Sequence, residues 1–147
     1  MKKYNFIKKQ LSKTNKKNDE NYVVSRIWHL LNNTDVKMIT QQYIVRDVET
    51  KTYALADIYF PQINTIVEID EPYNLSDEMV LSDTMRQHDI VQAIECEVIR
   101  VKVTNDLQEM NERIDAIVLE LRQRFDQGDY QVWDVEQEYS PMTYVTR

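Results

Sequence analysis

The sequence predicts a single α/β domain in which a mixed four-stranded sheet is flanked by helices. Two observations favour this fold class. The chain has 147 residues, of which 42% are hydrophobic, and this is enough to bury one core without a disulfide or a structural metal. Its apolar residues also alternate between the helical period and the strand period in the order helix, three strands, helix, strand, helix.

The first helix is predicted over residues 19–31. Asn18 or Asp19 can cap its N-terminus, and the Asn32-Asn33 pair ends it. Its apolar residues recur at helical spacing and form one buried face: Val23, Val24, Ile27, Leu30 and Leu31.

Three strands follow, over residues 36–45, 53–60 and 63–70. They are rich in β-branched and aromatic residues, and residues 47–51 supply the turn between the first two. The Pro61-Gln62 corner predicts a tight hairpin between the second and the third. We therefore expect an antiparallel meander.

The second half of the chain predicts a helix over 83–95, a strand over 98–103 and a last helix over 105–125. A strand–helix–strand connection makes the fourth strand parallel to the third. Asn105 with Gln108 fits a capping box at the start of the last helix. An apolar stripe typical of core packing runs along that helix: Leu107, Met110, Ile114, Ile117, Leu121 and Phe125.

The charge distribution divides the chain into three parts. The net charge of −7 speaks against a nucleic-acid partner, yet residues 1–18 carry seven lysines and no acid, which leaves −14 on the remainder. The basic segment is either an arm that binds nucleic acid or a solvated terminus. We expect a basic arm (1–18), a folded domain (19–127) and an acidic aromatic tail or linker (128–147).

The sequence lacks the two features that would direct the chain into or across a membrane. No apolar stretch approaches the roughly 18 residues of a membrane-spanning helix, and no signal-peptide core follows the first lysines. Cys96 is the single cysteine, so it is expected to be a small buried residue in a reducing cytoplasm. We expect no membrane partner.

Three carboxylates on the second and third strands are the candidate site. Glu68 and Asp70 point to the same side of their strand, and Asp57 on the neighbouring strand can approach them if the hairpin pairs as predicted. Converging carboxylates repel one another unless a cation lies between them. Hard oxygen ligands suit Mg²⁺, with Mn²⁺ as a substitute, and such a site hydrolyses phosphodiesters. Alternatively, the acids only mark solvent-exposed strand positions.

Several short segments resemble a known family more specifically than the acids do. The order of the elements, with Asp and then Glu-x-Asp on the meander, is similar to the Vsr-like branch of the PD-(D/E)XK nuclease fold. Over about residues 13–103 the chain resembles the N-terminal catalytic domain of the AbaSI-type restriction endonucleases, which cleave DNA containing hydroxymethylcytosine or its glucosylated form. The resemblance rests on Asn15-Lys16-Lys17, Glu20-Asn21-Tyr22-Val23-Val24, Ile27-Trp28, Thr40-Gln41-Gln42-Tyr43, Tyr59-Phe60-Pro61-Gln62 and Glu68-Ile69-Asp70-Glu71-Pro72-Tyr73.

The resemblance implies roles for four acids. Asp57 and Asp70 would be metal ligands and Glu68 a third acidic member of the site. Asp70 stands where the family pattern Glu-x-Lys has a lysine, which the Vsr-like branch tolerates. Glu20 would be an outer ligand or a positioning group, although acids favour the first turn of any helix and Glu20 can equally be a surface charge.

The proton acceptor departs from the pattern of Vsr-like enzymes, which tend to place a histidine shortly after the third strand. The nearby position here is Asn74, whose amide cannot accept a proton at neutral pH. His88 and His29 are the only histidines. His88 lies on the predicted helix 83–95 and either reaches the site or faces solvent.

Basic residues near the acids are candidates for binding DNA phosphate. Arg100 and Lys102 share one face of the fourth strand, and a cationic pair beside carboxylates can clamp a phosphate. Alternatively, they balance the acids Glu68, Asp70 and Glu97. The full set of candidates is Lys16, Lys17, Arg86, Arg100 and Lys102.

The resemblance implies a Mg²⁺-dependent DNA endonuclease domain, the cleavage module of a modified-cytosine-dependent restriction system in a bacterial or phage-associated setting. Its expected partners are double-stranded DNA, a separate or missing SRA-like recognition domain, and a second copy in a homodimer. The helix over 105–125 is the first surface to test for dimer contacts, although its stripe can be core. The alternative is a catalytically inactive nuclease fold that binds or regulates a partner, such as an acidic mimic of DNA.

Overall fold

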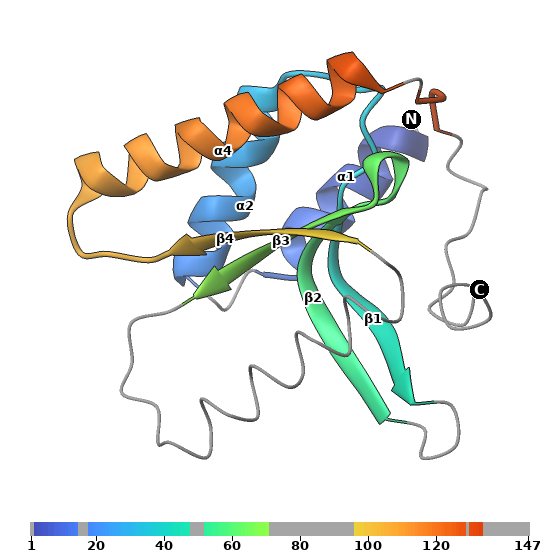
Figure 1. Ribbon diagram of the computed structural model, residues 1–147, viewed down its shortest axis with the longest axis horizontal. Helices are drawn as coiled ribbons and strands as arrows, with labels where there is room; N and C mark the ends of the chain where they lie inside the picture. Colours follow the sequence, from blue (N-terminus) through green and yellow to red (C-terminus); the bar gives the residue numbers. More distant parts are fainter. Residues whose placement is uncertain (1, 15–17, 48–51, 71–95, 129, 134–147) are drawn as a thin grey trace.

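Four strands form one mixed sheet in the order β1-β2-β3-β4, with helices packed against it (Figure 1). The computed structural model describes residues 2–14, 18–47, 52–70, 96–128 and 130–133. The elements are α1 (Lys2–Ser12), α2 (Asn18–Leu31), β1 (Ile39–Asp47), β2 (Thr52–Phe60), a 3-10 turn η1 (Pro61–Ile63), β3 (Thr65–Asp70), β4 (Glu97–Lys102) and α4 (Leu107–Gln127).

The predicted sheet topology is confirmed. β1 pairs antiparallel with β2 and β2 antiparallel with β3, while β4 lies parallel to β3. This is the α/β architecture that the periodicity indicates. The helix predicted over residues 83–95 lies outside the described part of the chain.

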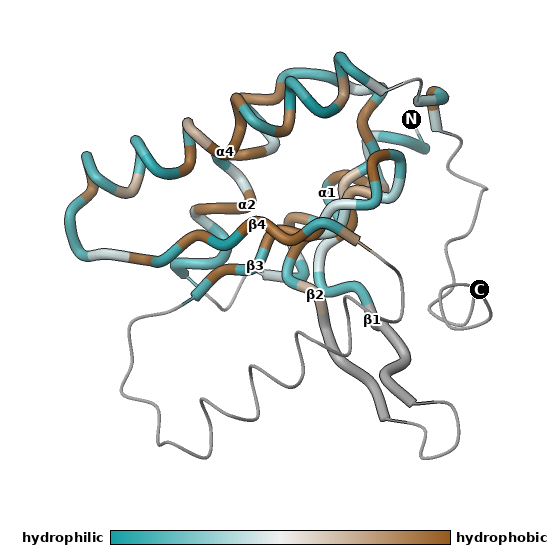
Figure 2. The backbone as a smooth tube through the Cα atoms, viewed as in Figure 1, coloured by the Kyte–Doolittle hydropathy of each residue, from teal (hydrophilic) through white to brown (hydrophobic). Residues whose placement is uncertain are grey.

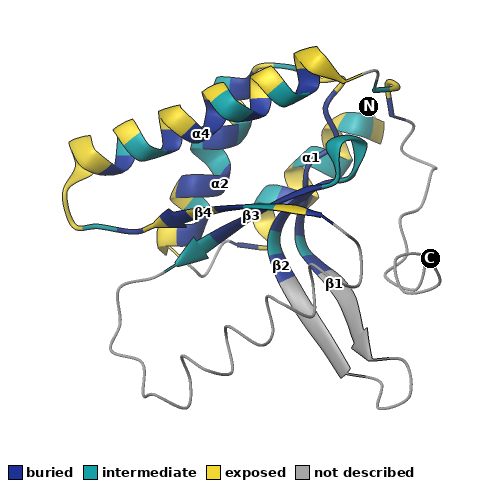
Figure 3. Ribbon diagram, viewed as in Figure 1, coloured by how far each residue is buried: buried dark blue, intermediate teal, exposed yellow. Residues whose placement is uncertain are grey.

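The hydrophobic core lies between the sheet and helices α2 and α4, whose buried sides turn toward the strands (Figure 3). Figure 2 shows the same faces as the hydrophobic ones. Alternate residues of the two parallel strands enter this core: Val67 from β3, and Ile99 and Val101 from β4. The predicted stripe of α4 is buried from Met110 to Phe125, so this part of it packs the core. Leu107, the first residue of the predicted stripe, is 64% exposed, and the homodimer stays a prediction.

Residues 2–14 are docked on the fold, whereas the sequence predicts an arm or a solvated terminus. Gln10 in α1 is buried, and its Oε1 accepts the Thr40 N–H at 2.9 Å while its carbonyl accepts the Thr40 hydroxyl at 2.6 Å. The Lys13 Nζ donates to the Thr40 carbonyl at 3.3 Å. Burial lowers the pKa of Lys13, and the nearby Lys9 adds to this effect. Residues 2–14 therefore contact strand β1.

Part of the predicted tail is also packed. The Trp133 side chain is buried, and its Nε1 donates to the Thr34 carbonyl at 3.1 Å. Its ring lies 5.1 Å from that of Phe6 in α1, and the amines of Lys3 and Lys37 lie over it at 4.9 and 5.3 Å. Residues 130–133 thus contact the N-terminal helix. The division of the chain into arm, domain and tail otherwise stays a prediction.

The predicted tight hairpin at Pro61-Gln62 is confirmed, and the predicted capping box at Asn105 is wrong. The hairpin between β2 and β3 is the 3-10 turn η1, closed by Asn64 at φ 46° in the left-handed region, with the Asn64 N–H donating to the Pro61 carbonyl. The N-cap of α4 is Asp106, whose side chain accepts the Glu109 N–H at 3.0 Å. Asn105 lies one residue too early, because the helix begins at Leu107.

Candidate active site

Asp57 marks the point at which β2 and β3 diverge. The paired residues of these strands run from Phe60↔Thr65 to Ile58↔Val67. One residue further, the Asp57 Oδ2 accepts the Ile69 N–H at 2.7 Å. The Asp57 carboxylate therefore accepts the hydrogen bond that a carbonyl of the neighbouring strand would otherwise accept. Because Ile69 lies between Glu68 and Asp70, this bond places Asp57 between the two acids of β3.

The strand registers align the polar residues across the sheet. Thr40↔Ile58 and Gln42↔Ala56 put Gln41 level with Asp57, and continuing past Ile58↔Val67 puts Asp57 level with Glu68. Glu68 is itself paired with Arg100 across the parallel ladder. Two of the three predicted acids, Asp57 and Glu68, therefore lie in one cross-sheet row, bounded by a glutamine on β1 and an arginine on β4, while Asp70 lies level with Lys102. We call this row the acid row: Gln41, Asp57, Glu68 and Arg100.

Asp70 is held by Arg100. The Arg100 Nη1 donates to both Asp70 oxygens, at 2.8 and 3.0 Å, and both side chains are partly exposed. An arginine and a carboxylate in this geometry form a charge-assisted pair. The interpretation of Arg100 as a counter-ion of the acids is therefore realised in this structure, and its role toward phosphate stays a prediction.

Two of the predicted site acids are buried. Glu68 and Glu20 are each 4% exposed, although the sequence leaves solvent-exposed positions open for both. The Gln41 Nε2 donates to the Glu20 Oε1, and the Gln41 backbone has φ 52°. Burying a carboxylate is costly without donors, so these positions are built into the fold and are not incidental surface charges.

A divalent cation suits the chemistry of these donors only in part. Carboxylate oxygens are the ligands that Mg²⁺ and Mn²⁺ prefer, and Asp57 and Glu68 bring two of them to neighbouring strand positions. Both oxygens of Asp70 are bonded to Arg100. In the part of the chain that the structure describes, no group of three or more His, Cys, Asp and Glu side chains is arranged to hold a metal. Asp57 and Glu68 fit such an ion, and Asp70 is engaged by Arg100 in this structure.

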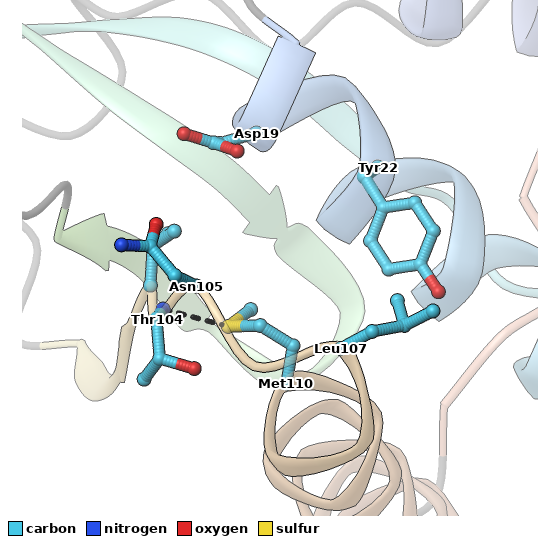
Figure 4. A pocket seen from close by; sticks show the side chains of 7 residues that line it. Asp19, Tyr22, Thr104, Asn105, Leu107 and Met110 are labelled. Atoms are coloured by element: carbon cyan, nitrogen blue, oxygen red, sulfur yellow. Dashed lines mark hydrogen bonds between the residues drawn. The ribbon is translucent and has the colours of Figure 1, made fainter.

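A pocket of about 340 Å³ lies between the first turns of α2 and the segment where β4 ends and α4 begins (Figure 4). The Val103 N–H on its wall donates to the Asp70 carbonyl at 2.9 Å, which connects the pocket to the end of β3. The Thr104 N–H donates to the Met110 sulfur at 3.1 Å. The lining is mixed polar and apolar: Asp19, Tyr22, Val103, Thr104, Asn105, Leu107 and Met110.

The remaining predicted site residues are only partly visible. Lys102 is exposed on β4, level with Asp70, on the same side of the strand as Arg100, as predicted. His29 is exposed in the last turn of α2. Outside the described residues lie Lys16, Lys17, Asn74, Arg86 and His88.

The sequence analysis missed Gln41 as a member of the site. Its left-handed backbone and its contact with Glu20 depend on how α2 sits against β1, which no local pattern reports. The Thr40-Gln41-Gln42-Tyr43 segment carried part of the family resemblance, and that was the available signal.

A mixed sheet with acids where two strands diverge, covered by helices, is the architecture of a restriction-endonuclease-like nuclease domain. The model of the PvuRts1I-like restriction endonuclease family, N-terminal domain, matches residues 4–122, and the chain belongs to this family. The recognition of the AbaSI-type catalytic domain from sequence is thereby confirmed.

The fold comparison agrees. The structure is similar to that of "The 5-Hydroxymethylcytosine-Specific Restriction Enzyme AbaSI", with 30% sequence identity and a TM-score of 0.66 over 97% of this chain. That match covers 54% of the AbaSI chain, so this sequence spans about half the length of that relative. A comparison with curated proteins found no match.

Proposed function

We propose that this chain is a metal-dependent endonuclease domain that hydrolyses phosphodiester bonds in double-stranded DNA containing modified cytosine. Membership of the restriction endonuclease family supports nuclease activity, and restriction-endonuclease folds generally use divalent metals. The observation that carries the proposal is the bond between Asp57 and the Ile69 amide, because it brings the acid of β2 between Glu68 and Asp70.

In this proposal Asp57 and Glu68 hold a divalent cation, Mg²⁺ or Mn²⁺. The bound ion would offset the charge of the phosphate and supply a more acidic water. Arg100 exchanges its bond to Asp70 for one to the substrate phosphate, which frees the Asp70 carboxylate. Lys102, exposed on the same strand, adds a second positive charge toward the DNA backbone.

The test is cleavage of three duplexes that contain plain, hydroxymethylated or glucosylated hydroxymethylated cytosine, with Mg²⁺ or Mn²⁺. We expect metal-dependent cleavage of a modified duplex, and loss of at least about 100-fold in rate for Asp57→Asn, Glu68→Gln or Asp70→Asn. Asp115→Asn is the matched control, since Asp115 pairs with Arg26 between α4 and α2 and should leave the rate unchanged.

Two outcomes would count against the endonuclease. No cleavage of any duplex with either ion, in a chain that melts cooperatively, would rule out an autonomous nuclease. Cleavage that survives Asp70→Asn and Glu68→Gln together would assign the chemistry to other residues.

The partners follow from the relative. AbaSI is described as specific for 5-hydroxymethylcytosine, and we propose that this chain supplies the cleavage module of such a system. Base recognition then comes from a separate SRA-like domain, and cleavage of both strands from a homodimer. The helices in the described part of the chain include none that could span a membrane. We propose that the chain acts on DNA in the cytoplasm.

Two observations favour the alternative of a nuclease fold that binds or regulates without cutting. Both Asp70 oxygens are paired with Arg100, and the chain beyond residue 18 carries a net charge of −14. A chain that binds no cation, cuts no duplex and lowers the activity of a partner nuclease would support this acidic module.

A further inference from the structure

Gln41 has an unusual backbone conformation within a regular strand pairing. Its φ of 52° lies in the left-handed region, which residues other than glycine seldom occupy. The pairs on either side, Thr40↔Ile58 and Gln42↔Ala56, keep the register of β1 and β2. Such a conformation persists only where its surroundings hold it, and it is a reason to look for a function.

The side chain of Gln41 meets a buried charge. Its Nε2 donates to the Glu20 Oε1, and Glu20, in the first turn of α2, is 4% exposed. A donor on a carboxylate favours its ionised form and fixes its orientation. The left-handed backbone therefore aims an amide at the one buried acid that a helix contributes among the described residues.

The position of Gln41 connects this acid to the candidate active site. Gln41 lies level with Asp57 on β2, and Asp57 in turn reaches the Ile69 amide of β3. Glu20 of α2 is thus bonded to Gln41 of β1, and Gln41 lies level with an acid of β2 that is bonded to β3. Strands β2 and β3 carry the predicted metal ligands. A glutamine with only a packing role would not need a left-handed backbone, a hydrogen bond to a buried carboxylate and a position level with Asp57.

We propose that Gln41 is a positioning residue of the candidate active site, which holds the Glu20 carboxylate beside the acid row so that it can accept hydrogen bonds from the water shell of a divalent cation. The inference rests on the proposed function in one respect, because it requires that a divalent cation binds at Asp57 and Glu68. Gln41 itself touches neither the ion nor the DNA.

Calorimetric titration of the protein with Mn²⁺, without DNA, tests the positioning role. We expect Gln41→Leu to raise the Kd for Mn²⁺ by about tenfold or more, as for other residues that orient the outer shell of a metal. Gln41→Gly should raise it equally. Glycine accepts a positive φ without strain, so this variant separates the lost side chain from any distortion of the backbone.

A double-mutant cycle tests whether Gln41 acts through Glu20. Glu20→Gln keeps an oxygen that can accept from Gln41 but removes the charge. If Gln41 works by positioning that charge, then Gln41→Leu changes the Mn²⁺ Kd by less than about twofold in the Glu20→Gln background. Additive effects, or a Kd unchanged in Gln41→Leu, would overturn the inference.

Gln62→Leu is the matched control. The Gln62 Nε2 donates to the carbonyls of Asp35 and Gln131 at 2.9 and 2.7 Å, so this variant should lower the melting temperature and leave the Mn²⁺ Kd unchanged. A similar change in the Mn²⁺ Kd in Gln62→Leu and Gln41→Leu would show that Mn²⁺ binding is weakened by a general loss of stability and not by lost positioning.

The result also separates this inference from the proposed function. A parent chain that binds Mn²⁺ but cuts no duplex refutes the endonuclease, and the cycle still decides the role of Gln41. A parent chain that gives no binding heat with Mn²⁺ overturns the inference, and the cleavage assay then decides the function independently.

Discussion

In the proposed function, Arg100 pairs either with Asp70, where it hinders cation binding, or with a phosphate of the DNA. It holds both oxygens of Asp70, so Arg100→Met should free a carboxylate and lower the Mn²⁺ Kd by about two- to fivefold without DNA. The same variant loses a phosphate contact, so the slope of log K for DNA against log salt should fall by about 1. Calorimetry and fluorescence anisotropy measure the two effects.

Arg113→Met is the control for Arg100→Met. Arg113 pairs with Glu109 one turn earlier on α4, away from the acid row, so both binding constants should stay as in the parent. Weaker Mn²⁺ binding in Arg100→Met would mean that Arg100 helps to build the cation site and does not compete with it.

The site residues differ in how far the sequence predicts them. Alternation along a strand places Glu68 and Asp70 together, and a predicted hairpin brings Asp57 to them, because both rules are local. The burial of Glu20 depends on the docking of α2 against β1, and Gln41 depends on a backbone torsion. Neither leaves a local pattern in the sequence.

At the scale of single elements, variants at the start of α4 test whether Asp106 is the N-cap of this helix. Asp106→Ala removes the side chain that accepts the Glu109 N–H, so we expect a loss of about 1 kcal/mol in the free energy of unfolding. Asn105→Ala should change it by less than about 0.5 kcal/mol. Urea denaturation of both variants measures the difference, and a larger loss in Asn105→Ala would restore the original capping box.

Trp133 tests whether residues 130–133 belong to the folded domain. Trp133→Ala removes the ring packed on Phe6 and the hydrogen bond to Thr34, so we expect a loss of about 3 kcal/mol in the free energy of unfolding. Val132→Ala is the control, because Val132 is 62% exposed. Equal, small losses in both variants would mean that this segment contributes little.

Helices and strands with strong apolar periodicity were predicted well, and those without it were missed. Helix α2 and strand β4 lie within one or two residues of the expected bounds, because their buried faces repeat regularly. Helix α1 is rich in lysine and is anchored through Gln10 and Phe6. Its attachment depends on single contacts with distant residues, which periodicity does not report.

At the scale of the whole molecule, the excess of acid should weaken folding at low salt. The net charge is −7, and like charges repel more strongly when screening is weak. We expect the melting temperature to rise by a few degrees between about 20 and 200 mM NaCl. Differential scanning calorimetry measures this shift, and a melting temperature that falls with salt would mean that attractive ion pairs dominate.

The bond from Asp57 to the Ile69 amide has a consequence for the history of such chains. Catalytic acids are often costly to stability, so a lineage that no longer cuts DNA is free to lose them. Asp57 differs, because its loss would leave the Ile69 N–H between β2 and β3 without this acceptor. Selection for a folded chain alone would preserve a hydrogen-bond acceptor at this position. An aspartate at this position in a divergent relative is therefore a weak sign of surviving activity, and Glu68 and Asp70 are the better markers.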